Sequence, residues 1–367
     1  MEILIFIAVI VALIVVHEFG HFVAAKWSGM RVDEFGLGYP PRAMVMGKIG
    51  ETEYTLNWLP FGGFVKIYGE DGKQEAGAVA ESRAFSARPR ILQALVLVAG
   101  VAMNLLFAYI LITGALIAGT PRALSDNEIS IAHDKELAVA SVLPASPAAL
   151  AGFLLGDSIL NASSASGRWS TFDPKSFSAF VAASRGEQIT LDVIRNGHQL
   201  SITATPATGV APDDPSRYAL GVEVAIVGVV PLSLGSAVVE GARITWGATV
   251  LTAVGLWQFF FGVFTLSADL SQVAGPIGIA GIVGGASAQG LGYLFSIIAI
   301  ISINLALINL IPVPALDGGR LLFVIIESVI RRPIKTSVAH AMNAVGFVFL
   351  VLLMLVVTAS DIFKIIR

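Results

Sequence analysis

Four long apolar runs dominate the chain, over residues 3–25, 91–118, 291–311 and 341–359. A helix needs about 20 apolar residues to cross a bilayer, so we expect each run to form a transmembrane helix. The first run resembles a cleavable signal peptide in position only. It has no positively charged start and no small-residue cleavage site follows it, so we interpret it as a span that the mature protein keeps.

The segments between these runs are predicted to hold β-structure. In residues 31–75, the pieces ETEYTL and GGFVKIY alternate in polarity and carry aromatic or β-branched residues, which is typical of strands. Residues 125–225 are polar, with pieces such as LAVASV and ITLDVIR separated by Gly, Ser, Asn and Pro turns. We therefore expect a polytopic α-helical membrane protein of about four transmembrane helices, with a membrane-associated β-hairpin region and an inserted α+β domain.

These expectations divide the chain into three parts. Residues 1–120 form the N-terminal half of a membrane core, residues 125–225 a separate soluble domain, and residues 230–367 the C-terminal half of the core. Lys and Arg gather in 26–90 and 320–335, and such positive charge near span ends marks the cytoplasmic side. Both termini and the soluble domain are then expected outside the cytoplasm.

Composition supports a membrane protein and narrows the chemistry. The chain is 55% hydrophobic and 13% charged, with a mean hydropathy of +0.80, whereas a soluble domain carries about a quarter charged residues. A net charge of −3 and the absence of a basic run give no support for nucleic-acid binding. The chain has no cysteine, which excludes disulfides and cysteine-ligated metals.

Residues 17–21, HEFGH, place two histidines and a glutamate inside the first apolar run. A charged residue at the centre of a membrane helix costs roughly 2.5–3.5 kcal/mol, so polar residues there are normally functional. His17 and His21 lie one turn apart on one helix face and can bind one zinc ion. Zinc lowers the pKa of water to about 7, and Glu18 would take the proton of that water and pass it to the leaving amine. The alternative, two core histidines bonded to a neighbouring helix, leaves three polar groups in hydrocarbon without a ligand.

A catalytic zinc site needs a third protein ligand and an open position for water. Asp317 follows the third run in INLIPVPALDGGR, where Pro312 and Pro314 break the helix and free the backbone to present the carboxylate. An ordinary Asp-Gly turn at a membrane exit is the alternative interpretation of Asp317, and Glu327 is the weaker candidate ligand.

A fifth apolar block, residues 246–265, is long enough to pass as another span. His17 and His21 lie late in the first span, toward the cytoplasm, and the second and third spans bring Asp317 back to the same depth. A further crossing before Asp317 would put it on the opposite face. We therefore predict that 235–266 is a surface-lying or re-entrant helix rather than a span.

Together these motifs resemble the site-2 protease family of intramembrane zinc proteases, most closely its bacterial members of the regulator of sigma-E protease type. The resemblance rests on HEFGH, LPFGGFVKI, GPIGIAG and NLIPVPALDGG, which occur in this order along nearly the whole chain. It implies one Zn²⁺ per chain held by His17, His21 and Asp317, with Glu18 as the catalytic acid and base.

The resemblance also implies which residues near Asp317 meet the substrate. Asn309, Pro312 and Pro314 match the family's N-x-x-P-x-P-x-x-D-G pattern, in which the asparagine contacts the substrate near the scissile bond. Implied substrates are single-span membrane proteins of the bacterial cytoplasmic (inner) membrane, such as anti-sigma factors already cut outside, and leftover signal peptides.

A second implied contact with the substrate lies in the β-hairpin region. By resemblance, residues 35–68 are membrane-associated hairpins whose edge strand, around Gly62, Gly63 and Phe64, pairs with an unwound substrate. A helix hides its peptide bonds, so cleavage needs an extended segment, and strand addition supplies one.

Residues 125–225 resemble a single PDZ module, because SPAALAGFLLGDSIL is followed by RGEQITLDVIRNGHQLSITATP. A Gly-Leu-Gly-Phe-like carboxylate-binding loop is not visible, and KELAVASV occupies its expected place. Two roles stay open for the module: binding of a peptide ligand, and steric filtering that admits only substrates already trimmed outside.

Two other classes of function are weighed against a protease. A PDZ-bearing scaffold protein with a structural metal site would not need Glu18 and would prefer a closed fourth ligand. A metal transporter would distribute polar groups over several spans, and the middles of the second and fourth runs offer almost none. We therefore expect a membrane zinc metalloendopeptidase whose active site lies toward the cytoplasmic side.

Overall fold

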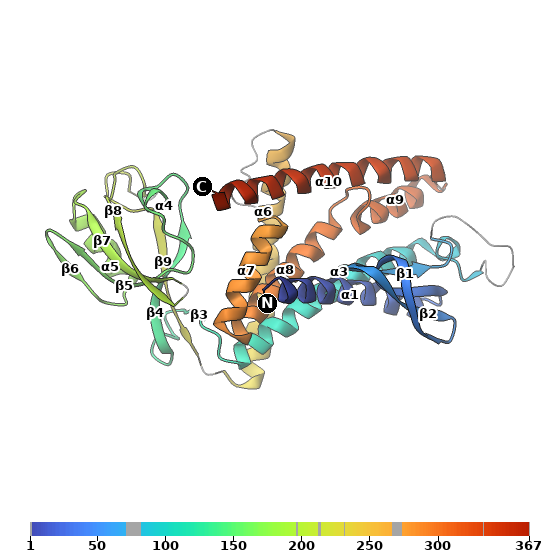
Figure 1. Ribbon diagram of the computed structural model, residues 1–367, viewed down its shortest axis with the longest axis horizontal. Coiled ribbons are helices and arrows are strands. Elements are labelled where there is room, and N and C mark those ends of the chain that lie inside the picture. Colours follow the sequence, from blue (N-terminus) through green and yellow to red (C-terminus); the bar gives the residue numbers. More distant parts are fainter. Residues whose placement is uncertain are drawn as a thin grey trace. The chain divides into compact units, whose positions relative to one another are not determined.

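The computed structural model describes residues 2–70, 82–195, 197–211, 214–230, 232–265, 274–332 and 334–366. The chain divides into two compact units, Met1–Ala115 with Ala237–Arg367, and Leu116–Ser236. The first, which we call the helical unit, holds the long apolar helices, and the second, the sheet unit, holds most of the strands (Figure 1).

Five helices among the described residues are long and apolar enough to cross a membrane. Four occupy the predicted runs: α1 (Glu2–Trp27), α3 (Arg90–Ile117), α8 (Leu291–Leu310) and α10 (Thr336–Ile366). Even α8, the shortest with 20 residues, reaches about 30 Å, the thickness of the hydrocarbon core. The expectation of a helical membrane protein with a β-structured region is confirmed.

The fifth helix, α6 (Leu234–Phe264), contains nearly all of the apolar block 246–265. It runs for 31 residues as one helix, so the chain does not reverse direction inside it. Its N-terminal turns pack on α3, where the Tyr109 hydroxyl donates to the Val238 carbonyl at 3.3 Å. In Figure 1, α6 runs crosswise to α1 and α10. By length and composition alone α6 qualifies as a span.

Two shorter helices complete the helical unit. α7 (Pro276–Gln289) packs against α1 and α8, with Val283 buried beside Val9 and Leu13. α9 (Asp317–Ile330) begins directly after the Pro-rich turn that ends α8, so the first residue of α9 is Asp317 itself. A 3₁₀ turn, η1 (Phe85–Ala87), precedes α3.

The hairpin region consists of β1 (Val32–Ile49) and β2 (Thr52–Ile67), which form an antiparallel sheet with several register shifts. Residues 34–37 lie opposite 63–66 and also opposite 53–56, so they form the middle of this sheet. Among the described residues no further strand pairs with the 63–66 segment. Within the described part of the chain that segment is therefore an edge of this sheet.

The sheet unit is built on a seven-stranded antiparallel sheet in the order β3-β9-β4-β5-β7-β8, with β6 paired to β5. Its strands are β3 (Arg122–Ala123), β4 (His133–Val142), β5 (Ser158–Ser164), β6 (Gly167–Trp169), β7 (Ile189–Arg195), β8 (His198–Ala204) and β9 (Val222–Val229).

Two short helices, α4 (Pro147–Ala151) and α5 (Pro174–Ala183), accompany this sheet. Both begin at a side-chain cap, since Ser146 and Asp173 accept hydrogen bonds from the first turns. Alternate strand residues and Phe177 of α5 bury one apolar core. β9 continues to Val229, beyond residue 225 where the predicted domain ends.

Candidate metal centre

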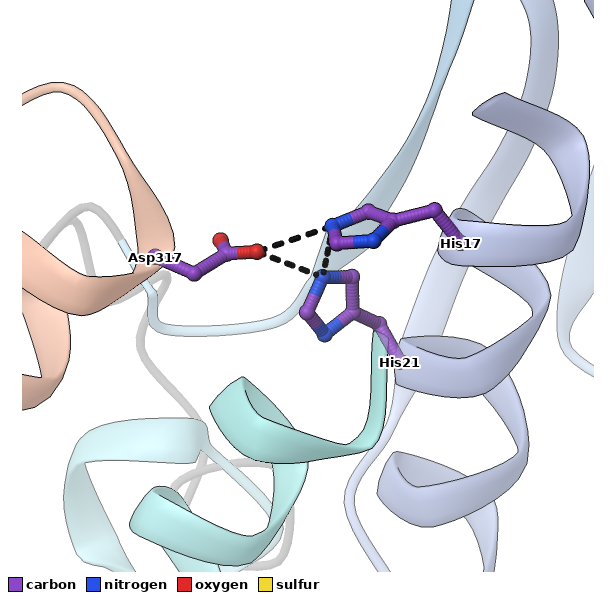
Figure 2. Close-up of side chains that lie close together, drawn as sticks. All are labelled: His17, His21 and Asp317. Atoms are coloured by element: carbon purple, nitrogen blue, oxygen red, sulfur yellow. Dashed lines mark hydrogen bonds and ion pairs between the residues drawn. The ribbon is translucent and has the colours of Figure 1, made fainter. Parts of the chain in front are cut away.

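Three side chains that the sequence analysis proposed as ligands meet at one point of the helical unit (Figure 2). Asp317 Oδ2 lies 2.9 Å from His17 Nε2 and 3.2 Å from His21 Nε2, and the two Nε2 atoms are 3.1 Å apart. Both histidines are buried, with 5% and 8% of their surface exposed. Helix α1 supplies the two imidazoles from successive turns, and the first residue of α9 supplies the carboxylate.

The outer nitrogens of both imidazoles are also engaged. His21 Nδ1 lies 2.8 Å from the carbonyl oxygen of Val96, an atom that can only accept, so Nδ1 carries the proton. His17 Nδ1 faces the side-chain amide of Asn104 at 3.2 Å. Outer partners of this kind orient metal-binding histidines, and the proton on Nδ1 of His21 leaves its Nε2 free for a metal.

The geometry of the three inner atoms fits a zinc ion. Zinc bonds of about 2.0–2.1 Å in a tetrahedral arrangement place neighbouring ligand atoms about 3.3 Å apart. The separations of 2.9–3.2 Å among these atoms are close to that value. Two imidazole nitrogens and one carboxylate oxygen also leave a fourth position open, which a catalytic zinc site requires.

Glycines allow α1 and α3 to approach closely enough to build this site. A Cβ atom on Gly20 would lie 2.4 Å from the Ala99 carbonyl oxygen. A Cβ atom on Gly100 would lie 2.6 Å from His21 Nε2 and 2.8 Å from His17 Cε1. No side chain fits at either position without displacing a backbone or the imidazoles, so the histidines occupy the space that Gly100 leaves.

The turn between α8 and α9 presents Asp317. Ala315 has φ = +81°, a left-handed conformation that costs an alanine roughly 1–2 kcal/mol. The Asn343 side chain of α10 accepts a hydrogen bond from the Ala315 N–H at 3.2 Å. Gly346 of α10 packs on the same turn, since a Cβ there would lie 2.0 Å from the Pro314 carbonyl oxygen. α10 thus supports the turn that carries the ligand.

Glu18 lies beside the edge of the hairpin sheet. A Cβ atom built on Gly63, in the edge segment, would be 3.6 Å from Glu18 Cγ. The side chain that the sequence assigns to proton transfer therefore follows His17 directly in α1 and lies beside the 63–66 edge segment.

The remaining predicted residues occupy distinct places. Asn309, near the end of α8, brings Nδ2 within 3.3 Å of His17 Nε2 and so borders the cluster. Pro312 and Pro314 form the turn before Asp317. Gly62 has φ = +106° at the start of the edge segment, and Phe64 lies opposite Gly36 within it.

Glu327, the alternative third ligand, is engaged elsewhere. Its Oε2 pairs with Arg90 at 2.7 Å, and its Oε1 accepts from the Ile334 N–H at 2.8 Å. Among the described residues the ligand cluster comprises His17, His21 and Asp317 only.

Three residues around the site escaped the sequence analysis. Gly100 and Asn104 of α3 touch the histidines, and Asn343 of α10 holds the turn before Asp317. Asn104 left a visible signal, because it is a polar residue in the middle of an apolar run. No sequence signal distinguishes Gly100 from the other glycines of the chain, or Asn343 from other polar residues near helix ends.

Comparison with known proteins identifies the family of this chain. Residues 5–353 match peptidase family M50. A Clostridium perfringens protein named "putative zinc metalloprotease" is 34% identical over 351 residues, covering 96% of this chain and 95% of the relative. A Nostoc protein with the same designation is 35% identical over 358 residues, covering 95% and 93%. The zinc metalloprotease RasP of Geobacillus kaustophilus is 28% identical over 437 residues, covering 98% and 97%.

Proposed function

Because this chain belongs to peptidase family M50, whose members are zinc metalloproteases that act by intramembrane proteolysis, we propose that His17, His21 and Asp317 hold its zinc ion and Glu18 moves the proton. The observation that carries this assignment is the meeting of those three ligand atoms, 2.9–3.2 Å apart, on helices far apart in sequence. It accounts for polar groups that a membrane helix would otherwise hold at a large cost.

The residues around the proposed zinc site have different roles in hydrolysis. Zinc, when bound, supplies a Lewis acid that lowers the pKa of water and polarises the scissile carbonyl. The Glu18 carboxylate takes a proton from the attacking water and delivers it to the leaving amine nitrogen. The Asn309 amide, 3.3 Å from His17 Nε2, is placed to donate to the substrate backbone next to the bond that is cut.

The hairpin edge presents the substrate in extended form. Residues 63–66 have their sheet partner on one side, and Glu18 lies close to Gly63. A substrate segment that adds to this edge is unwound by the main-chain hydrogen bonds it gains, and its peptide bonds reach the proton-transfer group. Gly62 and Gly63, with Phe64, form the part of the edge nearest the site.

The substrates that suit this arrangement are single-span membrane proteins. Backbone groups in the hydrocarbon core of a bilayer must be hydrogen-bonded, which normally keeps a membrane segment helical. A single helix can unwind locally once a strand edge supplies the hydrogen bonds that its backbone groups lose. Anti-sigma-factor-like proteins trimmed outside, and remnant signal peptides, belong to this class by the resemblance given above.

We propose four spans, α1, α3, α8 and α10, with α6 lying along the membrane surface. One feature supports this arrangement: α6 runs crosswise to α1 and α10 (Figure 1). Three crossings before Asp317 then place all three ligands in the cytoplasmic half of the inner membrane, with the sheet unit outside.

In the sheet unit, we propose a PDZ module with a peptide groove. A groove of about 300 Å³ lies between α5 and the start of β9, lined by apolar side chains that include Phe177, Val181 and Leu220. β3 pairs with β9 only at Val227 and Gly228, so among the described strands residues 222–225 have β4 as their single neighbour. An open strand edge beside an apolar helix favours peptide binding over a purely steric role.

The direct test compares wild-type protein with Glu18→Gln on a tagged single-span substrate in detergent, with and without a zinc chelator. We expect wild-type protein to cut once within the substrate's span. The cleavage rate should be about 10²–10⁴-fold lower in Glu18→Gln, because general acid-base catalysis contributes that much. Zinc content should stay at one ion per chain in Glu18→Gln. Glu136→Gln, the same change on the exposed face of β4, is the matched control and should cleave normally.

Cleavage that persists in Glu18→Gln would remove Glu18 from the mechanism. Zinc bound by wild type together with failure to cut any single-span substrate would instead favour the scaffold class of function.

A further inference from the structure

One buried amide in α3 has no role in the mechanism above. Asn104 has none of its surface exposed, in the middle of a helix that spans the membrane. Its backbone carbonyl accepts a hydrogen bond from the Ser302 hydroxyl of α8 at 2.8 Å. Its side chain reaches His17 Nδ1 at 3.2 Å. An unpaired polar group buried at this depth costs free energy, so a polar residue there normally has a structural or functional role.

The two histidines differ in how their outer nitrogens are held. His21 Nδ1 faces a backbone carbonyl, which can only accept, so His21 is fixed with its proton on Nδ1. His17 Nδ1 faces an amide, which offers an acceptor oxygen at one end and a donor nitrogen at the other. A carbonyl allows one tautomer, whereas an amide supports either.

The atoms of Asn104 reveal which tautomer each amide orientation supports. With Nδ2 toward His17, the imidazole accepts at Nδ1 and holds its proton on Nε2, against Asp317; Asn104 Oδ1 is then buried with no partner. Oxygen and nitrogen of an amide are interchanged by a half-turn. After that half-turn Oδ1 accepts the Nδ1 proton of His17, and the Nε2 lone pair is free for a metal.

We propose that Asn104 is a positioning residue that fixes the metal-binding tautomer of His17, by accepting its Nδ1 proton through Oδ1. This inference rests on the proposed ligation of zinc by His17. Asn104 touches neither substrate nor reacting atoms. Its effect passes through the orientation and basicity of one ligand, as outer partners of metal-bound histidines generally act.

The test measures zinc affinity by competition with a chelator, so that it does not depend on proteolysis. Asn104→Leu keeps the volume and removes the acceptor; we expect its zinc dissociation constant to rise about 10–100-fold. Asn104→Asp keeps an acceptor oxygen at the same place and should bind zinc within a few-fold of wild type. Asn304→Leu is the matched control, because that asparagine bonds to the Ile300 carbonyl of its own helix.

A second readout separates positioning from general damage. In protein labelled with ¹⁵N-histidine, the zinc-loaded wild type should show His17 protonated at Nδ1, and Asn104→Leu should lose that signature. Thermal unfolding of the zinc-free proteins should be the same for Asn104→Leu and Asn304→Leu. If Asn104→Leu does not fold, Asn104→Ala against Asn104→Asp provides the same comparison.

The outcomes distinguish the two proposals. Wild-type zinc affinity in Asn104→Leu, or an equal loss in Asn104→Leu and Asn104→Asp, overturns the positioning role alone. Wild-type affinity in His17→Ala overturns zinc ligation by His17, and the positioning role with it. The positioning role is established if Asn104→Leu loses zinc affinity and the Nδ1-protonated signal of His17, and Asn104→Asp keeps the zinc affinity.

Discussion

At the scale of single residues, the site depends on glycines without a side chain as much as on the side chains proposed to bind the metal. The histidines of α1 lie in the volume that Gly100 of α3 leaves empty, since a Cβ there would come within 2.6 Å of His21 Nε2. Real Cβ atoms do not approach so closely, so one added methyl group must displace an imidazole. In helix interiors the same change is otherwise favourable by roughly 0.5–1 kcal/mol.

We therefore expect Gly100→Ala to lose zinc and proteolytic activity while the helix itself is not weakened. Gly114→Ala is the control in the same helix, because its Cβ would meet Phe295 at an ordinary 3.6 Å. Zinc content per chain and cleavage of a single-span substrate are the measurements. Full zinc occupancy in Gly100→Ala would contradict the packing argument.

At the scale of elements, α10 and the hairpin hold the site without contributing ligands. α10 supports the turn before Asp317 through Asn343 and through close packing at Gly346. The hairpin is fastened where its tip returns to the end of α1. There Glu51 pairs with Arg83 at 2.6 Å and with Lys26 at 3.1 Å.

Asn343→Ala removes the acceptor that holds Ala315 in its left-handed conformation. A hydrogen bond of this kind contributes about 0.5–1.5 kcal/mol, so zinc affinity should fall by up to roughly tenfold. Adding Ala315→Gly should recover part of the loss, because glycine adopts positive φ without steric cost. Zinc competition on the single and double variants measures both effects; no recovery in the double variant would argue against strain at Ala315.

The fastening of the hairpin tip is expected to depend on pH. Hydrogen bonds from the Arg83 guanidinium, with a contribution from Lys26, lower the pKa of the Glu51 carboxyl from 4.5 to about 2. A carboxyl whose pKa is lowered by folding stabilises the folded state above its unfolded pKa. That stabilisation is lost as pH falls from about 4.5 toward 2.

Glu51→Gln should accordingly lower the unfolding temperature at pH 7, and the difference from wild type should shrink as pH falls below about 4.5. The pair is partly exposed, so the difference should also decrease in high salt. A difference that stays constant between pH 7 and pH 3 would exclude this pairing as its source.

At the scale of the whole molecule, all three proposed ligands belong to one of the two units. His17, His21 and Asp317 lie in the helical unit, and the groove beside α5 lies in the sheet unit. The two units have separate apolar cores. A metal that binds only one folded unit stabilises that unit in proportion to its affinity.

Removal of zinc by a chelator should therefore lower the unfolding temperature of the helical unit and leave that of the sheet unit unchanged. Calorimetry of the full chain in detergent would record both transitions. His21→Ala is the control, since in this variant the chelator should have no further effect. Equal shifts of both transitions would show that the units unfold together.

The sequence by itself determined the class of molecule, its four principal apolar helices and the chemistry of its centre. Apolar length is a local property, and a histidine pair four residues apart shares a helix face wherever that helix lies. The family followed from motifs in a fixed order along the chain. Asp317, the proposed third ligand, was a candidate from its place after a proline-broken helix.

Only the tertiary structure decided which neighbours complete the site. Gly100, Asn104 and Asn343 act through helices that meet α1 and the turn before Asp317 from distant parts of the chain. Their roles depend on a few tenths of an ångström of packing and on which atom faces which, and neither leaves a periodic signal. The groove of the sheet unit was missed likewise: its wall, residues 217–224, is distant in sequence from the strand β4 beside which it folds.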